Sequence, residues 1–314
     1  MFDRADLPEY VQIKDVAPRD GLQAEPKVLS VGDRVRLIDH LTASGVPYIE
    51  ASSFVSPKWL PQMAAAEEVM ARIERKPGVA YVALVPNPRG AERALDAKAD
   101  ELMVFLSASE THNYKNVHMS VSESLGGFHE ICAMARGEAV PVTAVIVTAF
   151  GCPYEGRVPL HAVLDLAIRL ESMGIADITL GDTVGVANPL QVAEMVHGFT
   201  LNAPMIRVSL HFHDNRGTAL ANLVAGVLAG CTRFETALGG IGGSPFSPGA
   251  GGNLATEDAV YCLQEMGIKT GIDLDRIMEG TRFLETAIGH PVPSRLYRAG
   301  GRMVPTGIPG AVDE

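Results

Sequence analysis

Strand-like and helix-like segments alternate along most of this chain, and that alternation restricts the fold more than any other feature of the sequence. Eight short apolar runs bounded by turn residues read as buried strands. They are Val11–Val16, Tyr48–Ala51, Val79–Val85, Glu101–Leu106, Val140–Val147, Asp177–Leu180, Arg207–His213 and Arg233–Leu238. Segments with helical periodicity lie between them, namely Val31–Ala43, Pro61–Arg75, Val121–Arg136, Leu160–Met173, Pro189–Phe199 and Thr218–Ala229. This pattern is typical of a parallel sheet covered by helices.

Eight strand–helix units without an evident linker predict one α/β domain, a (β/α)8 TIM barrel over residues 1–267. The chain has 314 residues, of which 47% are hydrophobic, and can therefore bury so large a core. Residues 268–314 are expected to add a helical extension, Asp273–Ile288, and a tail rich in proline and glycine, packed on or near the barrel. The sequence does not decide whether this tail is an ordered wrap around the barrel or a frayed end. A polar loop is expected at Ser107–Val117.

The overall charge and the cysteine pattern exclude several classes of function. The chain carries 26 Lys and Arg against 37 Asp and Glu, a net charge of −11, which argues against a broad nucleic-acid surface. No apolar run approaches the length of a membrane span, and the first ten residues lack the apolar region of a signal peptide. The four cysteines are widely spaced, as expected of reduced thiols. We therefore expect a soluble cytoplasmic protein.

His211 and His213 are the most informative residues for function, because they lie two positions apart at the end of a predicted strand. Side chains at i and i+2 of a strand point to the same face, which is the arrangement that a pair of metal ligands requires. The strand residues Arg207–Leu210 precede them and the turn Asn215–Gly217 follows. Taken alone, the pair fits a metal site and the alternative of one core histidine and one solvent-facing histidine equally well. Further candidate ligands elsewhere in the sequence are needed to choose between a metal site and this structural alternative.

Polar residues follow several predicted strands at the end where TIM barrels place their catalytic groups. Asp20 comes after the first strand, and Asn253 comes after a glycine-rich segment, residues 239–252, that predicts a mobile loop. With the two histidines they form a mixed nitrogen and oxygen set that suits octahedral Mg²⁺ or Mn²⁺ better than structural zinc. Each also has a structural alternative, since Asp20 could cap a turn and Asn253 could cap the next helix.

Five motifs together resemble those of the 3-hydroxy-3-methylglutaryl-CoA lyase family. They are Val16–Gln23, Ile49–Lys58, Leu180–Gly185, His211–Asp214 and Gly252–Asp258. The resemblance extends from about Val11 to Gly267 and places the chain in the wider group of barrel metalloenzymes that includes isopropylmalate synthase. It implies a homodimeric, metal-dependent lyase of an acyl-CoA substrate. The implied metal ligands are Asp20, His211, His213 and Asn253, the same set that the strand ends indicate.

Cleavage of 3-hydroxy-3-methylglutaryl-CoA to acetyl-CoA and acetoacetate requires loss of the hydroxyl proton and leaves negative charge on a thioester enolate. A divalent ion at the hydroxyl oxygen and a guanidinium at the enolate oxygen would stabilise these charges. The resemblance gives the second role to Arg19. Asp182 or a metal-held water is the predicted base, since a metal-bound histidine is a poor one, and Glu50 is the alternative. A salt bridge from Arg19 to Glu50 or Asp182 would also orient the guanidinium.

The chain departs from the family pattern in the glycine loop, where Ser244 replaces a catalytic cysteine. A thiol titrates near pH 8.5 and can exchange protons at neutral pH, whereas a serine hydroxyl can only relay them. Ser244 is consistent with an engineered substitution, with a different substrate, or with loss of the lyase reaction. The intact motifs disfavour the last. Arg216, after the histidine motif, is a second departure and either binds a substrate carboxylate or faces solvent.

Other functions stay open on sequence alone. They are a lyase for another 3-hydroxyacyl-CoA, a Claisen-type condensing enzyme of the same group, and a non-catalytic acyl-CoA binder. Because the protein is acidic, the phosphates of CoA need local cations or amides, for which the candidates are Lys58, Asn87, Arg89 and Lys115. Ordinary surface placement is the alternative for each of them.

Overall fold

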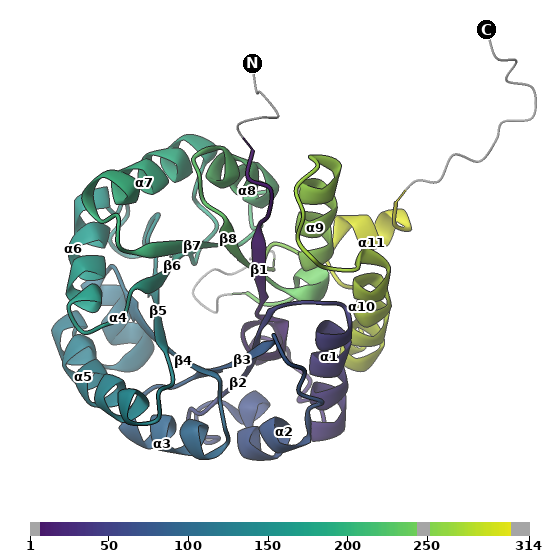
Figure 1. The fold of residues 1–314 in the computed structure, drawn as a ribbon, viewed down its shortest axis with the longest axis horizontal. Helices are drawn as coiled ribbons and strands as arrows, with labels where there is room; N and C mark the ends of the chain where they lie inside the picture. The colour runs from purple at the N-terminus through teal and green to yellow at the C-terminus, as the bar shows by residue number, and fades with distance from the viewer. Residues whose placement is uncertain (1–6, 244–251, 303–314) are drawn as a thin grey trace, which may run out of the picture.

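The computed structural model describes residues 7–243 and 252–302 and folds into a closed barrel of parallel strands (Figure 1). Each strand pairs with its neighbours in sequence, and the last pairs with the first, with Gln12 opposite Arg233. The strands are β1 Gln12–Asp15, β2 Tyr48–Ser53, β3 Ala80–Leu84, β4 Glu101–Ser107, β5 Val142–Val147, β6 Asp177–Asp182, β7 Arg207–Phe212 and β8 Arg233–Thr236. This confirms the predicted (β/α)8 fold.

Helices surround the barrel; most of them lie between consecutive strands, and the last three follow β8 (Figure 1). They are α1 Val31–Ala43, α2 Ala66–Arg72, α3 Pro88–Asp96, α4 Glu110–Val117, α5 Val121–Gly137, α6 Leu160–Glu171, α7 Pro189–Asn202, α8 Ala219–Leu228, α9 Thr256–Glu265, α10 Leu274–Ile288 and α11 Arg295–Ala299. Short helical turns occur at η2 Ala17–Gly21, η3 Pro61–Met63 and η4 Leu238–Gly240. Gly45 and Gly230 adopt left-handed backbone after α1 and α8, as expected of residues that end a helix.

Two sequence-based expectations were wrong. The segment expected to be a polar loop at Ser107–Val117 contains α4, because the Ser109 hydroxyl caps its first turn by accepting the backbone N–H of His112. The helix expected over Pro61–Arg75 is shorter. It begins only at Ala66, since Ala65 has a left-handed backbone with φ of 58° that separates η3 from α2.

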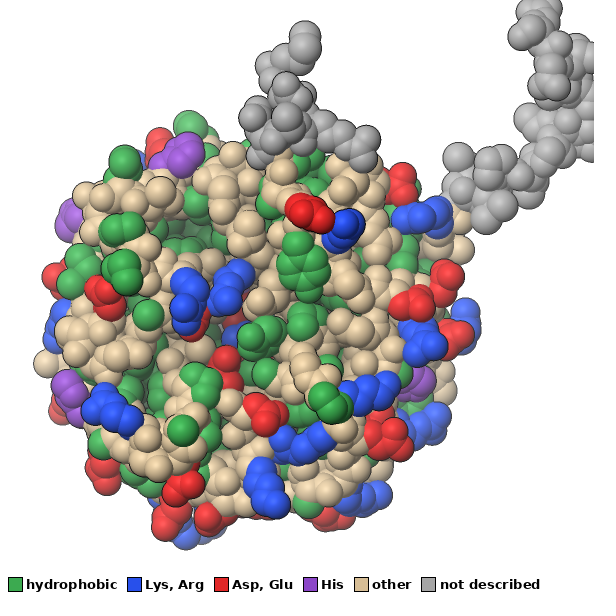
Figure 2. Space-filling model, viewed as in Figure 1, with side chains coloured by type: hydrophobic (Ala, Val, Ile, Leu, Met, Phe, Trp, Pro, Cys, Tyr) green, Lys and Arg blue, Asp and Glu red, His purple; other side chains and the backbone are tan. Residues whose placement is uncertain are grey.

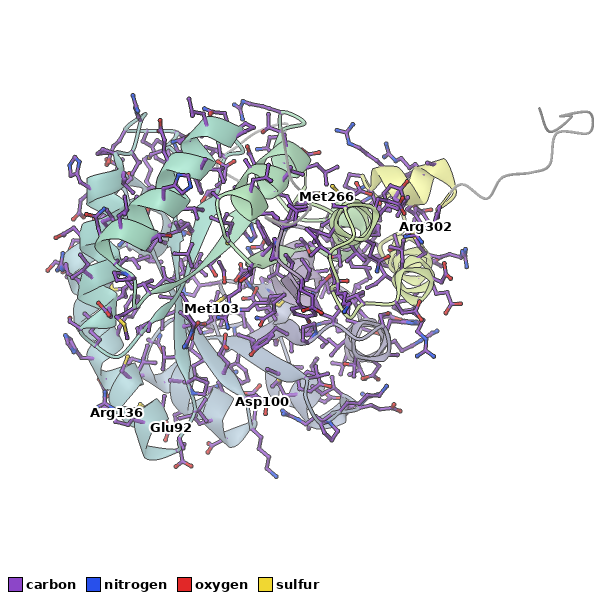
Figure 3. All side chains as sticks on the ribbon, turned by 45° about the horizontal axis from the view of Figure 1, so that its top comes forward. Glu92, Asp100, Met103, Arg136, Met266 and Arg302 are labelled. Carbon is purple, nitrogen blue, oxygen red and sulfur yellow. The ribbon has the colours of Figure 1, made fainter. Side chains whose placement is uncertain are left out.

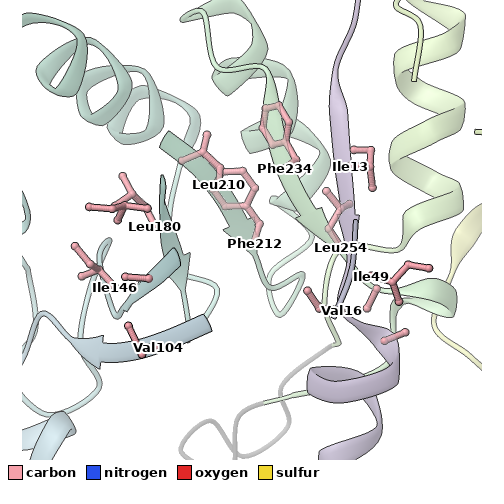
Figure 4. Packing of buried hydrophobic residues seen from close by; sticks show 14 of the residues in the cluster. Ile13, Val16, Ile49, Val104, Ile146, Leu180, Leu210, Phe212, Phe234 and Leu254 are labelled. Carbon is pink, nitrogen blue, oxygen red and sulfur yellow. The ribbon is translucent and has the colours of Figure 1, made fainter. Parts of the chain in front are cut away.

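The core lies between the strands and the helices that cover them. Leu210 and Phe212 of β7 are buried in this apolar layer, together with residues of neighbouring strands such as Leu180 and Phe234 (Figure 4). Because successive side chains of a strand point to opposite faces, His211 must face the barrel interior. The apolar pattern of β7 therefore sets the direction of its histidine.

The C-terminal extension packs beside the first helix of the barrel. Helix α10 contacts the end of α1, where Arg276 Nη1 donates to the Ala43 carbonyl and Asp273 N donates to the Ser44 carbonyl. Asp258 of α9 accepts the backbone N–H of Leu296 at 2.8 Å, which fixes the start of α11. Figure 3 places Arg302, beyond α11, on the opposite side of the molecule from Arg136 of α5.

Charged side chains of both signs are interspersed around the face shown in Figure 2. Within residues 7–243 and 252–302, no helix combines the length and the apolar character needed to cross a membrane.

Glu257 of α9 is a fully buried acid, and we expect it to make stability depend on pH. Its carboxyl group accepts the backbone N–H of Gly239 at 3.0 Å and lies 3.0 Å from Thr281 Oγ1. Burial raises its pKa from an ordinary 4.5 to about 7. Since the folded pKa is raised, this acid's contribution to stability is complete below about pH 4.5 and is lost as the pH rises through 7. The effect is worth up to about 3 kcal/mol.

A Glu257→Gln variant should therefore gain stability relative to wild type as the pH rises from 5 to 8. The uncharged amide has the same shape and can donate to Thr281 while accepting from Gly239, as a protonated carboxyl would. Thermal denaturation of both proteins at the two pH values measures the difference in Tm. A difference that does not change with pH would contradict the buried titration.

Candidate metal centre and active site

The described residues predicted for the site lie in or after five strands, namely β1, β2, β6, β7 and, for Asn253, β8, and they meet at one end of the barrel. Asp20 lies in η2 directly after β1, and Glu50 lies within β2 beside a break in its register with β3. Asp182 ends β6, His211 lies in β7, and His213 follows β7 directly. These positions are distant in the chain and become neighbours because parallel strands carry their C-terminal ends to the same rim.

Asp20, His211 and His213 could hold a metal ion together. One ligand atom from each of them lies within 4.8 Å of the other two. The Nδ1 atom of His211 lies 3.2 Å from Glu235 Oε2, and that of His213 lies 3.0 Å from the Asp182 carbonyl oxygen. Each ring therefore uses Nδ1 for the protein and leaves Nε2 for an ion. Burial lowers the pKa of His213 to about 4, so its ring is neutral, as a ligand must be.

Asn253 supplies the strongest sign that the cluster is built for an additional group. Its Nδ2 atom donates to Asp20 Oδ2 at 2.8 Å and to the Ile241 carbonyl at 3.0 Å, but its buried Oδ1 atom has no hydrogen-bond partner among the described residues. A buried amide oxygen without a partner is costly, and coordination of a hard cation would satisfy it. Asn253 does not cap α9, because Ala255 occupies that position.

Gly252 lets Asn253 reach this position. A Cβ atom on residue 252 would lie 1.6 Å from the Gly240 carbonyl oxygen, so no other residue fits there without moving the backbone of η4. His213 and Asn253 also form an isolated antiparallel bridge, which joins the end of β7 to this segment. The backbone thus brings the amide and the imidazole together.

Arg19 lies between two carboxylates. Its Nε atom donates to Glu50 Oε1 at 2.5 Å and its Nη1 atom donates to Asp20 Oδ1 at 3.0 Å. Burial opposes ionisation of Asp20, but Arg19 and the two histidines outweigh it and hold the pKa of Asp20 below its ordinary value. Burial raises the pKa of Glu50 to about 7, and its buried Oε2 atom has no hydrogen-bond partner within residues 7–243 and 252–302.

Asp182 is buried at the end of β6 and contacts the loop that follows. Its two carboxylate oxygens accept the backbone N–H groups of Val186 at 2.9 Å and Ala187 at 3.0 Å. Burial raises its pKa to about 6. Its role as a base stays a prediction, and these contacts also give it a part in shaping the loop.

Arg216 contacts the same loop from the exposed side. Its Nη1 atom donates to the carbonyl oxygens of Val184 at 2.7 Å and Gly185 at 2.9 Å. The side chain therefore joins the loops that follow β6 and β7, a role that the sequence did not suggest. The predicted site residue Ser244, and most of the predicted mobile loop, lie outside the described residues.

Most of the chain matches one known family. Residues 10–284 match the family described as HMGL-like. The chain belongs to the HMGL-like family. Hydroxymethylglutaryl-CoA lyase YngG of Bacillus subtilis is 46% identical over 288 residues, which are 92% of this chain and 96% of that protein. The 3-hydroxy-3-isohexenylglutaryl-CoA/hydroxymethylglutaryl-CoA lyase of Pseudomonas aeruginosa is 40% identical over 293 residues, covering 93% and 98% of the two chains.

The solved structures that resemble this HMGL-like chain include lyases of the same name as the sequence relatives. The HMG-CoA lyase of Bacillus subtilis superposes with a TM-score of 0.91 at 44% identity and covers 94% of this chain and 99% of that one. An HMG-CoA lyase of Acinetobacter baumannii, solved in complex with coenzyme A and 3-methylmalate, superposes with a TM-score of 0.90 at 43% identity. The superposition covers 98% of this chain and 100% of that one. The relatives are named as hydroxymethylglutaryl-CoA lyases, which are carbon–carbon lyases, and this chain is an enzyme of that family.

Two polar residues at the HMGL-like site were missed from the sequence. Gln23 donates to Asp20 Oδ1 at 3.1 Å, and Glu235 contacts His211 from β8. Gln23 belongs to the first motif, but its contact depends on the turn of η2. Glu235 stands within the buried part of β8, and a charged residue at an inward-facing position was the available signal.

Proposed function

We propose that this protein is a divalent-metal-dependent lyase that cleaves 3-hydroxy-3-methylglutaryl-CoA to acetyl-CoA and acetoacetate. The observation that carries the proposal is the cluster of Asp20, His211 and His213, completed by the unpartnered oxygen of Asn253 and placed beside Arg19. The donor set of carboxylate, amide and imidazole groups suits Mg²⁺ or Mn²⁺. When bound, such an ion supplies Lewis acidity at the substrate's hydroxyl oxygen.

Arg19 is assigned to the enolate oxygen that cleavage of the carbon–carbon bond leaves on the thioester. The hydrogen bonds to Glu50 and Asp20 use its Nε and Nη1 atoms, so Nη2 is the nitrogen assigned to the substrate. A guanidinium already oriented by two carboxylates needs no rearrangement when charge develops on the substrate, which favours the transition state. Burial of these groups strengthens the interaction further.

Glu50 and Asp182 are the two candidates for the group that takes the hydroxyl proton. We expect Glu50→Gln to lower kcat by about 10²- to 10⁴-fold and Asp182→Asn to lower it less. The reason is that Glu50 keeps one oxygen without a partner, whereas both oxygens of Asp182 accept backbone N–H groups. Steady-state kinetics at matched metal content compare the two variants. An equal or larger loss in Asp182→Asn would return the role to Asp182, and an undiminished rate in that variant would exclude it.

The nucleotide end of the acyl-CoA is assigned to a cavity beside α4. The cavity has a volume of about 590 Å³ and is lined by Glu110, Thr111, Tyr114, Lys115, His118 and Ser120. The ring of Trp59, which is 78% exposed, lies 6.4 Å from that of His118. Exposed aromatic rings beside a lysine suit an adenine base and a phosphate. Among the other predicted contacts, the Asn87 side chain caps α3, and Lys58 and Arg89 are exposed.

The assay that tests the function is release of acetyl-CoA and acetoacetate from 3-hydroxy-3-methylglutaryl-CoA with added Mg²⁺ or Mn²⁺. We expect product with metal and none with a chelator. A panel of other 3-hydroxyacyl-CoAs, including the isohexenyl ester named for the Pseudomonas relative, tests the second candidate, a lyase of different substrate preference. Tight binding of CoA without product from any ester, or condensation without cleavage, would contradict the proposal.

The same panel run on Ser244→Cys interprets the departure from the family's cysteine. A large gain limited to 3-hydroxy-3-methylglutaryl-CoA would indicate a lyase that the serine slows. Activity on another ester without the thiol would indicate altered specificity.

The proposal also includes a homodimer in the cytoplasm, in keeping with four cysteines that form no disulfide, and sedimentation analysis tests the dimer.

A further inference from the structure

We propose that Glu235 is a positioning residue for the metal ligand His211, and that Lys14 holds Glu235 in turn. The inference rests on the proposed function, because it takes His211 to bind the ion. It assigns a task to a set of charged residues inside the barrel, below the predicted site, that neither the sequence motifs nor the proposed catalytic roles include.

Glu235 contacts His211 directly across two paired strands. The residues stand opposite each other in the register of β7 and β8, and Glu235 Oε2 lies 3.2 Å from His211 Nδ1. Only 3% of Glu235 is exposed. An ionised carboxylate can only accept hydrogen bonds, so Nδ1 of the ring must carry the proton. Nε2 then keeps the lone pair that a metal ion requires.

The other oxygen of Glu235 is held by two further strands. Thr179 Oγ1 of β6 donates to Glu235 Oε1 at 2.8 Å, and Lys14 Nζ of β1 lies 3.5 Å from the same atom. Lys14 and Thr179 are themselves buried. The carboxylate is therefore fixed from two sides and neutralised within the barrel, which a buried charge requires. Its second oxygen, Oε2, is thereby turned toward His211.

The second histidine is held differently. His213 Nδ1 lies 3.0 Å from the backbone carbonyl of Asp182, a neutral acceptor that belongs to the strand end itself. Substitution of a side chain cannot remove that acceptor, whereas the acceptor of His211 is a single replaceable side chain. A mutation of Glu235, which is not a predicted ligand, can therefore change the hydrogen bonding of the His211 imidazole and leave that of His213 unchanged.

Glu101 offers a matched control in the same charged set. Its Oε1 atom lies 3.2 Å from Lys14 Nζ and 2.9 Å from Thr143 Oγ1, and it is buried like Glu235. It lies on β4, three strands away from β7 in the strand order. Glu101→Gln thus removes the same charge beside the same lysine without touching either histidine.

The experiment titrates Mn²⁺ into the metal-free full-length protein by calorimetry and compares the wild type with Glu235→Gln, Glu235→Asp and Glu101→Gln. An amide at 235 has one oxygen, which Lys14 and Thr179 attract, so its NH₂ group turns toward His211 and favours a proton on Nε2. We expect the Kd for Mn²⁺ to rise about 10- to 100-fold in Glu235→Gln, and less in Glu235→Asp. Glu101→Gln should bind as the wild type does.

Two readouts separate positioning from simple packing. If Glu235 only filled space, the isosteric Gln would be milder than the shorter Asp, whereas positioning by charge predicts the opposite order. Proton–nitrogen correlation spectra of the metal-free protein, labelled at histidine, should show the Nδ1–H tautomer of His211 in the wild type and its loss in Glu235→Gln. Equal Mn²⁺ affinity in the wild type and Glu235→Gln, or an equal loss in Glu101→Gln, would overturn the inference. Failure of the wild type itself to bind Mn²⁺ would contradict the proposed function as well.

Discussion

An Arg19→Gln variant is expected to retain its metal ion and to lose at least about 10²- to 10³-fold in kcat. The guanidinium is buried between Glu50 and Asp20 and is the cation assigned to the enolate oxygen. Glutamine is neutral and too short to hold both carboxylates, so charge developing on the thioester would have no cationic partner. Steady-state kinetics with 3-hydroxy-3-methylglutaryl-CoA, together with Mn²⁺ titration, measure the two effects separately.

Arg19→Lys is the informative companion to this variant. It keeps the positive charge but lacks the planar fork that contacts two carboxylates at once, so its kcat should lie between those of the wild type and Arg19→Gln. The variants should differ in kcat more than in KM, because the contact is assigned to the transition state. Loss of metal from Arg19→Gln in proportion to its loss of activity would contradict a direct role for the guanidinium.

Substitution of Asp20 should severely weaken metal binding and, with it, turnover. Asp20 is the only carboxylate in the described metal cluster, and its oxygens also receive hydrogen bonds from Arg19, Gln23 and Asn253. In Asp20→Asn the amide keeps the size of the side chain but removes the negative charge. We expect the Kd for Mn²⁺ to rise more than about 100-fold, beyond the range typical of residues that support a ligand.

Asp214→Asn is the matched control for this experiment. Asp214 follows His213 directly, but its carboxylate accepts the backbone N–H of Ala219 and contacts Arg295 instead of joining the cluster. The variant should bind Mn²⁺ as the wild type does. Equal affinity in Asp20→Asn and the wild type would show that the ion, if one binds, is held elsewhere.

Much of the fold and of the site follows from local patterns. The apolar runs and the helical periodicity predict the alternation of strands and helices, because each residue's neighbours in the chain decide these patterns. The spacing of His211 and His213 places both imidazoles on one face for the same reason. The motifs around Arg19, Glu50 and Asp182 indicate the family, and membership of the HMGL-like family is confirmed over residues 10–284.

Other features depend on contacts between segments that are far apart in the chain. The unpartnered oxygen of Asn253 depends on where η4, Gly252 and Asp20 meet, and 233 positions separate Asn253 from Asp20. The pairing of Glu235 with His211 follows from the register of two strands. Short-range patterns carry no information on these distances, because barrel closure sets them. The sequence thus determined which strand ends carry polar groups, and only the tertiary structure decided which of those groups face one another.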